Sequence, residues 1–368
     1  MKKLLFGITS LGLGGAERVL VDIANELSNK YNITIFTIYA NGELEKQLNS
    51  NINLKHLINK KYEELTKFEK ILKPIYIMLF KKFIYKKHIK SNYDVEVAFL
   101  EGPITRLFSS KNKSAKKIAW VHNDITKVFG NGMKAKLKKQ IDKNLYSKYD
   151  KIVFVSRDNQ EKFEEVYNLD VPKEVIYNYI DINSVIEKSN EKMDIEFDEN
   201  EINIVTVSRL VEQKAIDRLI EVHALLMQSG LKHKIYVIGD GPEKAKLEQL
   251  IKDKNVGDTF KLVGKKENPY PYIKKASFFA LLSYFEGYPM VLLEAQILKK
   301  HIIITNTAAR ETLRNYKNAM IVENDEEDIF IGLCKYIKMA KDIEEENKII
   351  EDYNNTDIIS QIERLIEE

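Results

Sequence analysis

Strand-like and helix-like segments alternate along almost the whole chain, and this alternation is the strongest constraint on its fold. The first series of expected strands is 3–9, 33–39, 94–100, 117–122 and 151–156, and the second is 202–208, 234–238, 260–263, 278–282, 301–305 and 319–322. Such a rhythm is typical of parallel sheets with helices on both faces. Because 368 residues suffice for two domains of ordinary size, we predict an α/β protein with two doubly wound domains.

A polar, acidic stretch, residues 181–203, separates the two series and is predicted to be the linker. The predicted domains are residues 1–180 and 181–345, followed by a helical, acidic tail at 346–368. Two doubly wound domains that face one another form a cleft, and such sheets bind ligands at their carboxyl edges. We therefore expect the functional site in an interdomain cleft.

Composition and charge narrow the class of protein. Apolar residues make up 44% of the chain and charged residues 31%, which is typical of a soluble globular protein. The first 180 residues carry 32 Lys and Arg against 20 Asp and Glu, whereas the remainder carries 26 against 35. The basic excess is concentrated in residues 60–90, 111–117 and 134–148.

Within residues 61–90, lysines are interleaved with aromatic and aliphatic side chains. An amphipathic basic segment of this kind lies on anionic lipid surfaces. The alternative is a solvated helix face packed on its own domain. An anionic membrane surface is therefore an expected partner, and nothing in the sequence points to nucleic acid.

Cysteine content and hydropathy bear on the compartment. The single cysteine, Cys334, cannot form an internal disulfide and lies in an apolar helical pattern, so we interpret it as a core residue in a reducing, cytosolic protein. The apolar run 4–8 leads into a glycine-rich turn and not into a cleavage site. No apolar run approaches the roughly 20 residues of a membrane-spanning helix.

Two carboxylates, Glu286 and Glu294, follow the apolar run 278–282 within the sequence SYFEGYPMVLLEA. Gly287 and Pro289 mark a turn and a helix is expected from Met290, so Glu286 lies in the loop and Glu294 inside the helix. A loop that follows a parallel strand lies at the ligand-binding edge of the sheet. Taken singly, Glu286 could be a turn residue and Glu294 a solvated helix position.

Two cations, Arg209 and Lys214, follow the strand 202–208 and precede a helix. The unpaired N–H groups of a helix amino terminus attract phosphate, and nearby cations add to that attraction. His223 falls on the apolar face of this helix and is interpreted as a core histidine.

Two features of the first half are placed at strand ends. The glycine-rich turn 12–15 connects the first strand to a helix and allows a close approach by a ligand, although many α/β proteins need glycine there for the bend alone. His122 follows the strand at 117–122 and is expected to point into the cleft, the alternative being a hydrogen-bonded structural histidine.

Residues 283–295, together with Arg209 and Lys214, resemble the donor site of retaining, sugar-nucleotide-dependent glycosyltransferases of family 4, the bacterial polysaccharide type also called glycosyl transferase group 1. That family has two glutamates separated by seven residues, as Glu286 and Glu294 are. The resemblance implies the GT-B fold, in which two Rossmann-like domains face an interdomain cleft and the last helix crosses back to the first domain.

The resemblance also assigns roles to residues. It implies that Arg209 and Lys214 hold the nucleotide diphosphate, that Glu286 holds donor-sugar hydroxyls, and that Glu294 holds the ribose. It also implies that His122 contacts the donor sugar and that main-chain groups at Val263 bind the base of the nucleotide. Other donor-site positions it implies are Gly14, Gly15, Gly287, Tyr288, Pro289 and Met290. Family members commonly have glycine after the lysine, where this chain has Ala215.

The implied reaction is transfer of a hexose or N-acetylhexosamine from a nucleotide diphosphate sugar, most simply a UDP-sugar, to a lipid-linked saccharide. Retention of anomeric configuration follows from the same resemblance. The lipid-linked acceptor, a role in cell-surface polysaccharide biosynthesis and a peripheral place on the inner membrane face are expected from the basic, amphipathic first half of the chain. No cofactor is expected. No metal is expected either, because the chain lacks an Asp-x-Asp triplet and its histidines lack ligand spacing.

Other functions fit less well. A glycosyltransferase acting on a protein or soluble acceptor is the first alternative. The dinucleotide-binding fingerprint of a NAD-dependent oxidoreductase would need Gly or Ala at position 17, where this chain has Glu17. It would also need an acidic residue at the end of the second strand, but the first acidic residue after that strand is Glu43, which is too far along the chain. A phosphate-loop ATPase would need a Gly-Lys-Ser/Thr ending that residues 239–244 lack. A non-catalytic binding module would not require the matching Arg, Lys and Glu residues.

Overall fold

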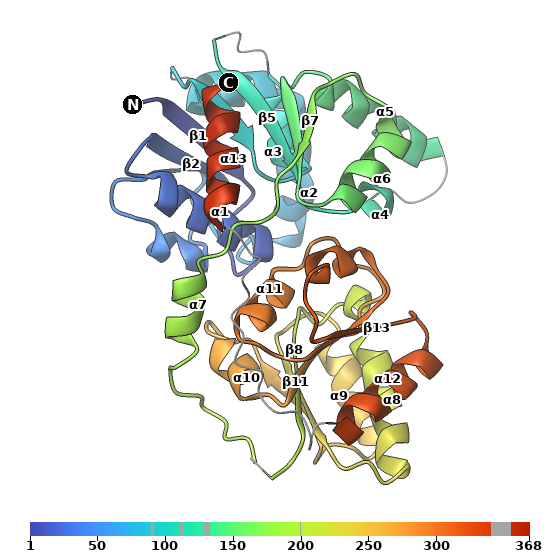
Figure 1. Ribbon diagram of the computed structural model, residues 1–368. Helices are drawn as coiled ribbons and strands as arrows, with labels where there is room; N and C mark the ends of the chain where they lie inside the picture. The colour runs from blue at the N-terminus through green and yellow to red at the C-terminus, as the bar shows by residue number, and fades with distance from the viewer. Residues whose placement is uncertain (90–91, 111–113, 129–132, 199, 340–354) are drawn as a thin grey trace. The chain divides into compact units, whose positions relative to one another are not determined.

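The computed structural model describes residues 1–368 except 90–91, 111–113, 129–132, 199 and 340–354 (Figure 1). It divides into two compact units. Unit 1 consists of Met1–Ile180 and Asn355–Glu368, and unit 2 of Asp181–Asn354. Several positions of the sequence predictions lie outside the described residues: 340–345 of the predicted second domain, 346–354 of the tail expected at 346–368, and Lys90, Lys111 and Lys113 of the basic clusters.

Unit 1 contains a seven-stranded parallel sheet in the order β3-β2-β1-β4-β5-β6-β7. Its strands are β1 (Lys3–Ile8), β2 (Asn32–Tyr39), β3 (Asn53–Ile58), β4 (Val95–Ala98), β5 (Lys116–Val121), β6 (Lys151–Phe154) and β7 (Lys173–Val175). Successive strands are added on one side up to β3 and then on the other from β4, so β1 and β4 flank the switch point where α/β sheets bind ligands. The edge strands β3 and β7 were not predicted, because they are only half-buried and lack a continuous apolar run.

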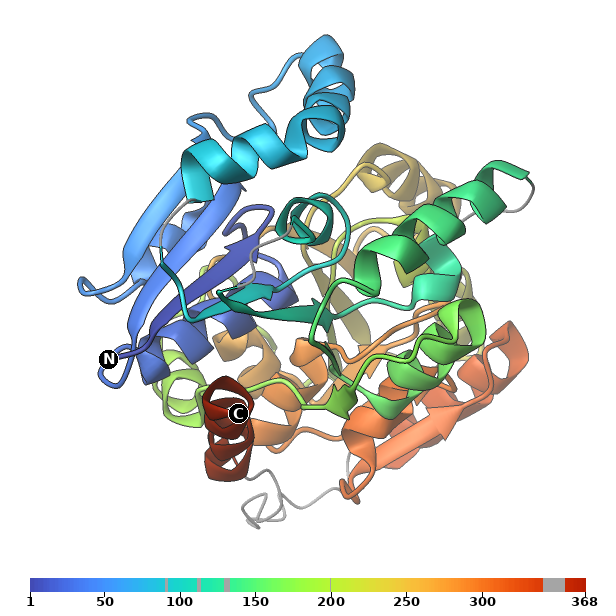
Figure 2. The ribbon, with the colours of Figure 1, turned by 90° about the horizontal axis from the view of Figure 1, so that it is seen from above.

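The helical elements of unit 1 flank this sheet. They are α1 (Gly15–Leu27), η1 (Glu43–Gln47), α2 (Lys67–Ile84), η2 (Tyr85–Ile89), α3 (Pro103–Phe108), α4 (Ile125–Val128), α5 (Met133–Tyr146), α6 (Arg157–Tyr167) and α13 (Asn355–Glu367). Figures 1 and 2 show α13 on the part of unit 1 that holds the chain's amino terminus. There it buries Ile358, Ile362 and Leu365, and Glu367 pairs with Lys2 (2.8 Å).

Unit 2 contains a six-stranded parallel sheet in the order β10-β9-β8-β11-β12-β13. Its strands are β8 (Asn203–Val207), β9 (Lys234–Ile238), β10 (Phe260–Gly264), β11 (Phe278–Leu281), β12 (Ile302–Thr305) and β13 (Ala319–Val322). All six correspond to predicted strands. Strands β8, β9, β11 and β12 are largely buried runs of branched or aromatic side chains, whereas the edge strands β10 and β13 are buried only at Phe260 and Val322. The switch point lies between β8 and β11.

The helical elements of unit 2 are α7 (Ile182–Lys188), η3 (Glu212–Lys214), α8 (Ile216–Gln228), α9 (Lys244–Asp253), α10 (Tyr270–Lys275), α11 (Met290–Ile297), η4 (Ala308–Leu313) and α12 (Glu326–Met339). The stretch 181–203, predicted to be a linker, begins with helix α7. The Asp181 carboxylate caps this helix by accepting the N–H of Ser184 (2.9 Å), and Val185 is buried. The stretch therefore opens with ordered structure that its polar composition concealed.

Helix α2 carries most of the basic, amphipathic segment. It begins with a capping box in which Thr66 and Glu69 satisfy one another's backbone N–H groups, and it is non-helical at Phe80. Only Ile77 and Ile84 of this helix are buried. Figure 2 shows the blue-to-cyan helical segment at the margin of unit 1. Across the described residues, no helix combines the length and hydropathy needed to cross a membrane.

Candidate active site

The loops after β8 and β11 meet in unit 2, because these strands are neighbours at the switch point. Lys214 ends η3 in the loop after β8, and Glu286 lies in the loop after β11. Their side chains form an ion pair with the Lys214 Nζ 2.5 Å from the Glu286 Oε1. The structure thus joins two predicted site residues that are 72 positions apart in the chain.

This ion pair is largely buried. The exposed fraction is 14% for the Lys214 side chain and 6% for that of Glu286. The Ser283 hydroxyl donates to the same oxygen of Glu286 (2.6 Å), which leaves Oε2 without a hydrogen-bond partner among the described residues. Glu286 is therefore a buried, oriented carboxylate, which argues against an ordinary exposed turn residue.

The loop that carries Glu286 is held at several points. The Thr305 hydroxyl donates to the Ser283 carbonyl (2.6 Å). The Gln213 side chain donates to the Phe285 carbonyl (2.9 Å), and the Tyr284 N–H donates to the Gln213 carbonyl (2.9 Å). Gln213 is adjacent to Lys214, so these contacts fix the two loops against each other.

Arg209 lies in the same loop as Lys214 but makes different contacts. Its side chain is exposed, and among the described residues it has neither an ion pair nor a hydrogen bond. The loop after β9 packs closely on this segment: a Cβ at Gly239 would lie 1.8 Å from the Ser208 carbonyl oxygen, so only glycine fits there. The guanidinium is thus available to an anion at the carboxyl edge of the sheet.

Ala215 joins the loop to α8 in a left-handed conformation, with φ 49° and ψ 38°. Only glycine adopts this conformation at no steric cost, which explains why a glycine is suited to this position. Here alanine adopts the same conformation, so the backbone path before α8 is kept despite the missing glycine.

Glu294 lies on α11, with Pro289 as the cap that precedes Met290. It is 7% exposed, and the Tyr270 hydroxyl donates to its Oε1 (3.4 Å). Glu294 is therefore not a solvated helix position. Gly287, Tyr288 and Pro289 are half-buried in the turn that leads to it.

Val263 lies at an irregularity in β10. The pairing with β9 passes from Leu262 opposite Val237 to Gly264 opposite Ile238, so Val263 has no opposite residue. A bulge of this kind leaves the extra residue outside the ladder. Val263 therefore lies at a bulge in the edge strand of the unit 2 sheet.

In unit 1, the glycine-rich turn follows β1, next to the switch point. Gly14 is the amino-terminal cap of α1 and Gly15, the first helical residue, is exposed. Gly14 is extended, with φ −99° and ψ 162°, so its backbone angles do not by themselves require glycine.

His122 directly follows β5 and is 9% exposed. Its ring packs on that of Phe99, with 4.7 Å between the ring centroids. Burial lowers the pKa of His122 to about 3, so the imidazole is neutral at physiological pH. Its Nε2 is buried and has no hydrogen-bond partner among the described residues, which is unusual for a structural histidine.

Glu101 is a polar residue at this edge that the sequence analysis missed. It follows β4, and its Oε1 accepts the N–H groups of His122 (2.5 Å) and Asn123 (2.7 Å), while its Oε2 accepts the Asn123 side-chain amide (3.0 Å). Burial raises the pKa of Glu101, and these N–H donors oppose that rise. The available signal was an acid followed by Gly102 and Pro103 immediately after a strand.

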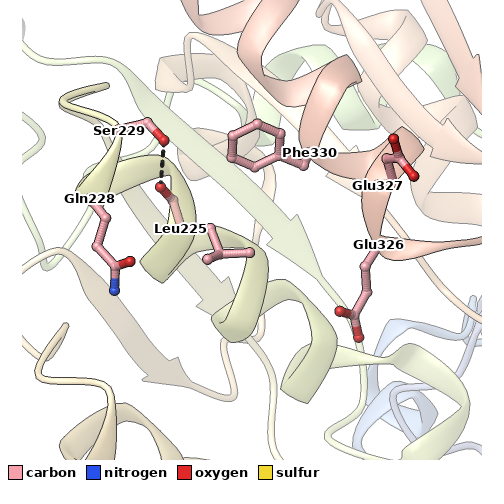
Figure 3. Close-up of a pocket in the computed structure, with 6 residues that line it drawn as sticks. All are labelled: Leu225, Gln228, Ser229, Glu326, Glu327 and Phe330. Carbon is pink, nitrogen blue, oxygen red and sulfur yellow. Dashed lines mark hydrogen bonds between the residues drawn. The ribbon is translucent and has the colours of Figure 1, made fainter.

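Two further features lie apart from these residues. A depression of about 390 Å³ on unit 2 is lined by Leu225, Gln228, Ser229, Glu326, Glu327 and Phe330. Figure 3 shows these six side chains, and none of them is a predicted site residue. In the part of the chain that the structure describes, no group of three or more His, Cys, Asp or Glu side chains is arranged to hold a metal ion.

Comparison with known proteins places both units in glycosyltransferase families. Residues 13–184 match the family model described as Glycosyltransferase Family 4, and residues 187–355 match that of Glycosyl transferases group 1. Together these matches span nearly the whole of both units.

Individual relatives agree with these family matches. A *Campylobacter jejuni* N-acetylgalactosamine-N,N'-diacetylbacillosaminyl-diphospho-undecaprenol 4-alpha-N-acetylgalactosaminyltransferase is 29% identical, over 96% of this chain and 93% of that protein. The crystal structure of *Anabaena* Alr3699/HepE in complex with UDP and glucose has a TM-score of 0.73 and 17% identity, over 100% of both chains. The crystal structure of TarM has a TM-score of 0.75 and 15% identity, over 100% of this chain and 99% of that one. With two parallel-sheet α/β units and family matches in each, this chain belongs to family 4 of the glycosyltransferases and has the GT-B fold.

Proposed function

We propose that this glycosyltransferase moves a hexose or N-acetylhexosamine from a UDP-sugar to a lipid-linked saccharide, with retention of anomeric configuration, in cell-surface polysaccharide biosynthesis. The observation that carries the proposal is the oriented Lys214–Glu286 pair at the switch point of unit 2, with Arg209, unpaired among the described residues, in the same loop as Lys214. The name of the Campylobacter relative, which specifies an undecaprenol diphosphate saccharide, supports the choice of acceptor. The UDP bound in the *Anabaena* structure supports the choice of donor.

Each residue has a role in this proposal. Arg209 and Lys214 hold the diphosphate beside the amino terminus of α8, Glu286 accepts hydrogen bonds from sugar hydroxyls, and Glu294 accepts those of the ribose. The neutral imidazole of His122 forms a hydrogen bond with the sugar. The backbone of Val263 contacts the base, with Gly14, Gly15 and the turn 287–290 completing the donor site.

The chemistry follows from charge. As the sugar–phosphate bond breaks, negative charge develops on the departing diphosphate, where Arg209 and Lys214 stabilise it. Loss of one preorganised donor of this kind typically raises the barrier by about 2.7–4 kcal/mol, or 10²- to 10³-fold in rate. The acceptor hydroxyl oxygen forms the new bond to the anomeric carbon on the face from which the diphosphate leaves, and a leaving phosphate oxygen takes up the hydroxyl proton. The reaction therefore requires neither an enzyme nucleophile nor an enzyme base.

Donor binding is tested by thermal unfolding with a panel of nucleotide diphosphates and nucleotide sugars. A ligand present at 100 times its Kd stabilises the native state by about 2.7 kcal/mol. We expect UDP and one UDP-sugar to raise Tm and Arg209→Ala to abolish the shift. Arg209 is exposed and unpaired among the described residues, so this variant should leave the Tm of the free protein unchanged.

Lys232→Ala is the matched control. Lys232 is also exposed but precedes β9, at the opposite edge of the same sheet, so this variant should keep the full ligand-induced shift. A Tm shift with NAD and none with any nucleotide sugar would overturn the proposal.

Retention is tested separately by NMR of the product formed from an α-linked donor. The proposal predicts an α-configured anomeric centre in the product, and an inverted centre would exclude it.

The proposed lipid-linked acceptor places the enzyme on the inner face of the membrane, and α2 is suited to bind that surface. Its exposed apolar residues are Phe68, Ile71, Leu72, Ile75, Tyr76, Met78, Leu79, Phe80 and Phe83. Several recur at spacings of three or four residues, on the side of the helix opposite the buried Ile77. Lysines on the same segment each contribute about 1 kcal/mol on an anionic surface.

Flotation with vesicles of phosphatidylglycerol or phosphatidylcholine tests this surface. The protein should float with phosphatidylglycerol vesicles, and Phe68→Asp/Ile71→Asp/Leu79→Asp should abolish flotation. Ile331→Asp is the control, because Ile331 is 55% exposed on α12 of unit 2. Equal flotation of the triple variant and the control would exclude α2 as the lipid-binding element and favour a soluble or protein acceptor.

A further inference from the structure

The turn after β5, residues 122–124, is held by side chains from neighbouring elements. Glu101 accepts the N–H groups of His122 and Asn123, as described above. On the other side of the turn, the Asn159 side chain from α6 donates to the His122 carbonyl (3.2 Å). The backbone of His122 is therefore bonded at both its N–H and its C=O by side chains outside the strand ladder.

The contact with Glu101 fixes the direction of the His122 side chain. A single oxygen, Oε1, accepts two consecutive N–H groups, and this orients the peptide plane between His122 and Asn123. Phe99, two residues before Glu101, packs on the imidazole ring. The segment after β4 thus contacts both the backbone and the ring of His122.

Charged groups also surround this turn. The Asp124 carboxylate, 6% exposed, accepts from Thr126 and pairs with Lys162 of α6 (2.8 Å), which also pairs with Asp158. Among the described residues, the hydrogen bonds of the Glu101 carboxylate come from neutral N–H donors and not from Lys162. The contribution of Glu101 is therefore the direction in which its Oε1 accepts the two backbone N–H groups. A glutamine oxygen can substitute for Oε1, and the exposed Asn123 amide then turns its own oxygen toward the new NH2 group.

We propose that Glu101 is a positioning residue, which holds the His122–Asn123 turn so that the unpartnered Nε2 of His122 is presented at the carboxyl edge of the unit 1 sheet. This inference rests on the proposed glycosyltransferase reaction and on the contact of His122 with the donor sugar. Glu101 itself need not touch either substrate.

The orientation of His122 is measured without substrate, by ¹⁵N-edited NMR of the histidine rings, with the His122 signals assigned from a His122→Gln variant. Glu101→Ala should shift or broaden the His122 signals and raise its pKa from about 3 toward 6.5, because the loosened turn admits water. Glu101→Gln retains an acceptor oxygen for both N–H groups and should leave the signals and the pKa near those of the parent protein.

Asp150→Ala is the matched control. The Asp150 carboxylate accepts the N–H of Lys117 (2.7 Å) at the start of β5, so this variant removes a carboxylate-to-backbone bond from the other end of the same strand. It should leave the His122 signals unchanged. Unchanged signals in Glu101→Ala, or equal changes in Asp150→Ala, would overturn the positioning role.

Activity provides the second measurement once the donor is identified. Misplacement of a binding group by about 1 Å can lower a rate by about 100-fold. We expect a fall in kcat of that order for Glu101→Ala, with a smaller change in KM, and nearly full activity for Glu101→Gln. A shifted His122 signal without any loss of kcat would contradict the role of His122 in the reaction, while leaving the effect of Glu101 on His122 established. A large loss of kcat in Glu101→Gln with unchanged His122 signals would show that the charge of Glu101 is needed and would exclude positioning.

Discussion

Ala215 shows how one backbone conformation limits the choice of residue before the α8 amino terminus. A left-handed conformation costs an L-residue roughly 1–2 kcal/mol, whereas glycine adopts it freely. Ala215 is fully buried, so burial of its methyl group stabilises the folded state by about 0.8 kcal/mol and offsets part of this conformational cost. The sequence revealed the missing glycine, but only the dihedral angles explain why one is favoured.

Substitutions at Ala215 should therefore follow side-chain branching. Ala215→Gly should change the free energy of unfolding by less than about 1 kcal/mol, because relief of strain and loss of the methyl contact oppose one another. Ala215→Val should destabilise by more than about 2 kcal/mol, since a β-branched residue fits this conformation poorly. Urea unfolding measures both, and equal stabilities of the two variants would contradict the argument.

Lys117 and Glu96 form a buried ion pair in unit 1, with 4% and 0% of each residue exposed. The Lys117 Nζ lies 3.0 Å from the Glu96 Oε2 and also donates to the carbonyls of Phe108 (2.6 Å) and Ser110 (2.5 Å). Burial lowers the pKa of Lys117 and the neighbouring carboxylate opposes this change. The network joins β4 and β5 to the end of α3.

Removing one member of this pair leaves the other charge buried. Lys117→Met should destabilise the protein by about 3–5 kcal/mol in urea unfolding. The double variant Lys117→Met/Glu96→Leu removes both charges and should be more stable than Lys117→Met alone. A double variant that is no more stable would show that the loss of the Tyr85 hydrogen bond to Glu96 outweighs the removal of the unpaired carboxylate.

At the level of elements, α8 packs on the unit 2 sheet through two histidines. Nδ1 of His233 donates to the Leu231 carbonyl (2.8 Å), so in neutral His233 Nε2 accepts from His223 Nδ1 (2.8 Å). Nε2 of His223 then accepts from the Thr259 hydroxyl (2.8 Å). The prediction that His223 is a core histidine is confirmed, because its side chain is fully buried.

This histidine chain should make unit 2 less stable in acid. Burial, and then the neighbouring His233, lowers the pKa of His223 to about 3, and burial also lowers the pKa of His233. Between pH 6.5 and about 3 the unfolded state binds more protons, so the stabilisation present above pH 6.5 is lost as the pH falls. The loss is up to about 1.4 kcal/mol per pH unit for each histidine.

Urea unfolding of the parent protein and of His223→Leu/His233→Leu at pH 7.5, 6.5 and 5.5 measures this effect. The double variant should lose less stability between pH 6.5 and 5.5 than the parent. In the double variant, the Thr259 hydroxyl no longer donates to His223 and can donate to the Val256 carbonyl instead (3.3 Å). Parallel pH profiles would exclude the histidines as the source of acid sensitivity.

At the level of the whole molecule, unit 1 is assembled from two separate parts of the chain. Helix α13 contributes Ile358, Ile362, Leu365 and Ile366 to the buried interior of that unit. Ion pairs surround this contact, including Lys30 with Glu363 (2.5 Å) and Lys151 with Glu368 (2.8 Å). Unit 1 therefore depends on residues that follow unit 2 in the sequence.

Disrupting α13 should destabilise unit 1 selectively. Ile362→Asp replaces a side chain that is 1% exposed, and burial of a side chain of this size is worth about 1.5–3 kcal/mol before the cost of the charge. Calorimetry should show the melting transition of unit 1 lowered and that of unit 2 unchanged. Ser360→Asp, on the exposed side of the same helix, is the control and should alter neither transition.

Local sequence patterns were enough to predict the fold class, all six strands of unit 2, and the positions of Glu286 in a loop and Glu294 in a helix. These features depend on local patterns of apolar residues, which can be recognised within segments of about five to ten residues. The half-buried edge strands β3 and β7 and helix α7 lacked such a pattern and were missed.

Tertiary structure decided which of these local features meet. The strand order makes the loops after β8 and β11 neighbours, so Lys214 contacts Glu286 although the two residues are 72 positions apart in the chain. It also places the loop after β4 next to the turn after β5, where Glu101 accepts the N–H of His122. Neither contact can be predicted from the local spacing of residues in the sequence, because the packing of the whole sheet determines which strands are neighbours. The same packing sets the left-handed backbone at Ala215 and the burial that keeps His122 neutral.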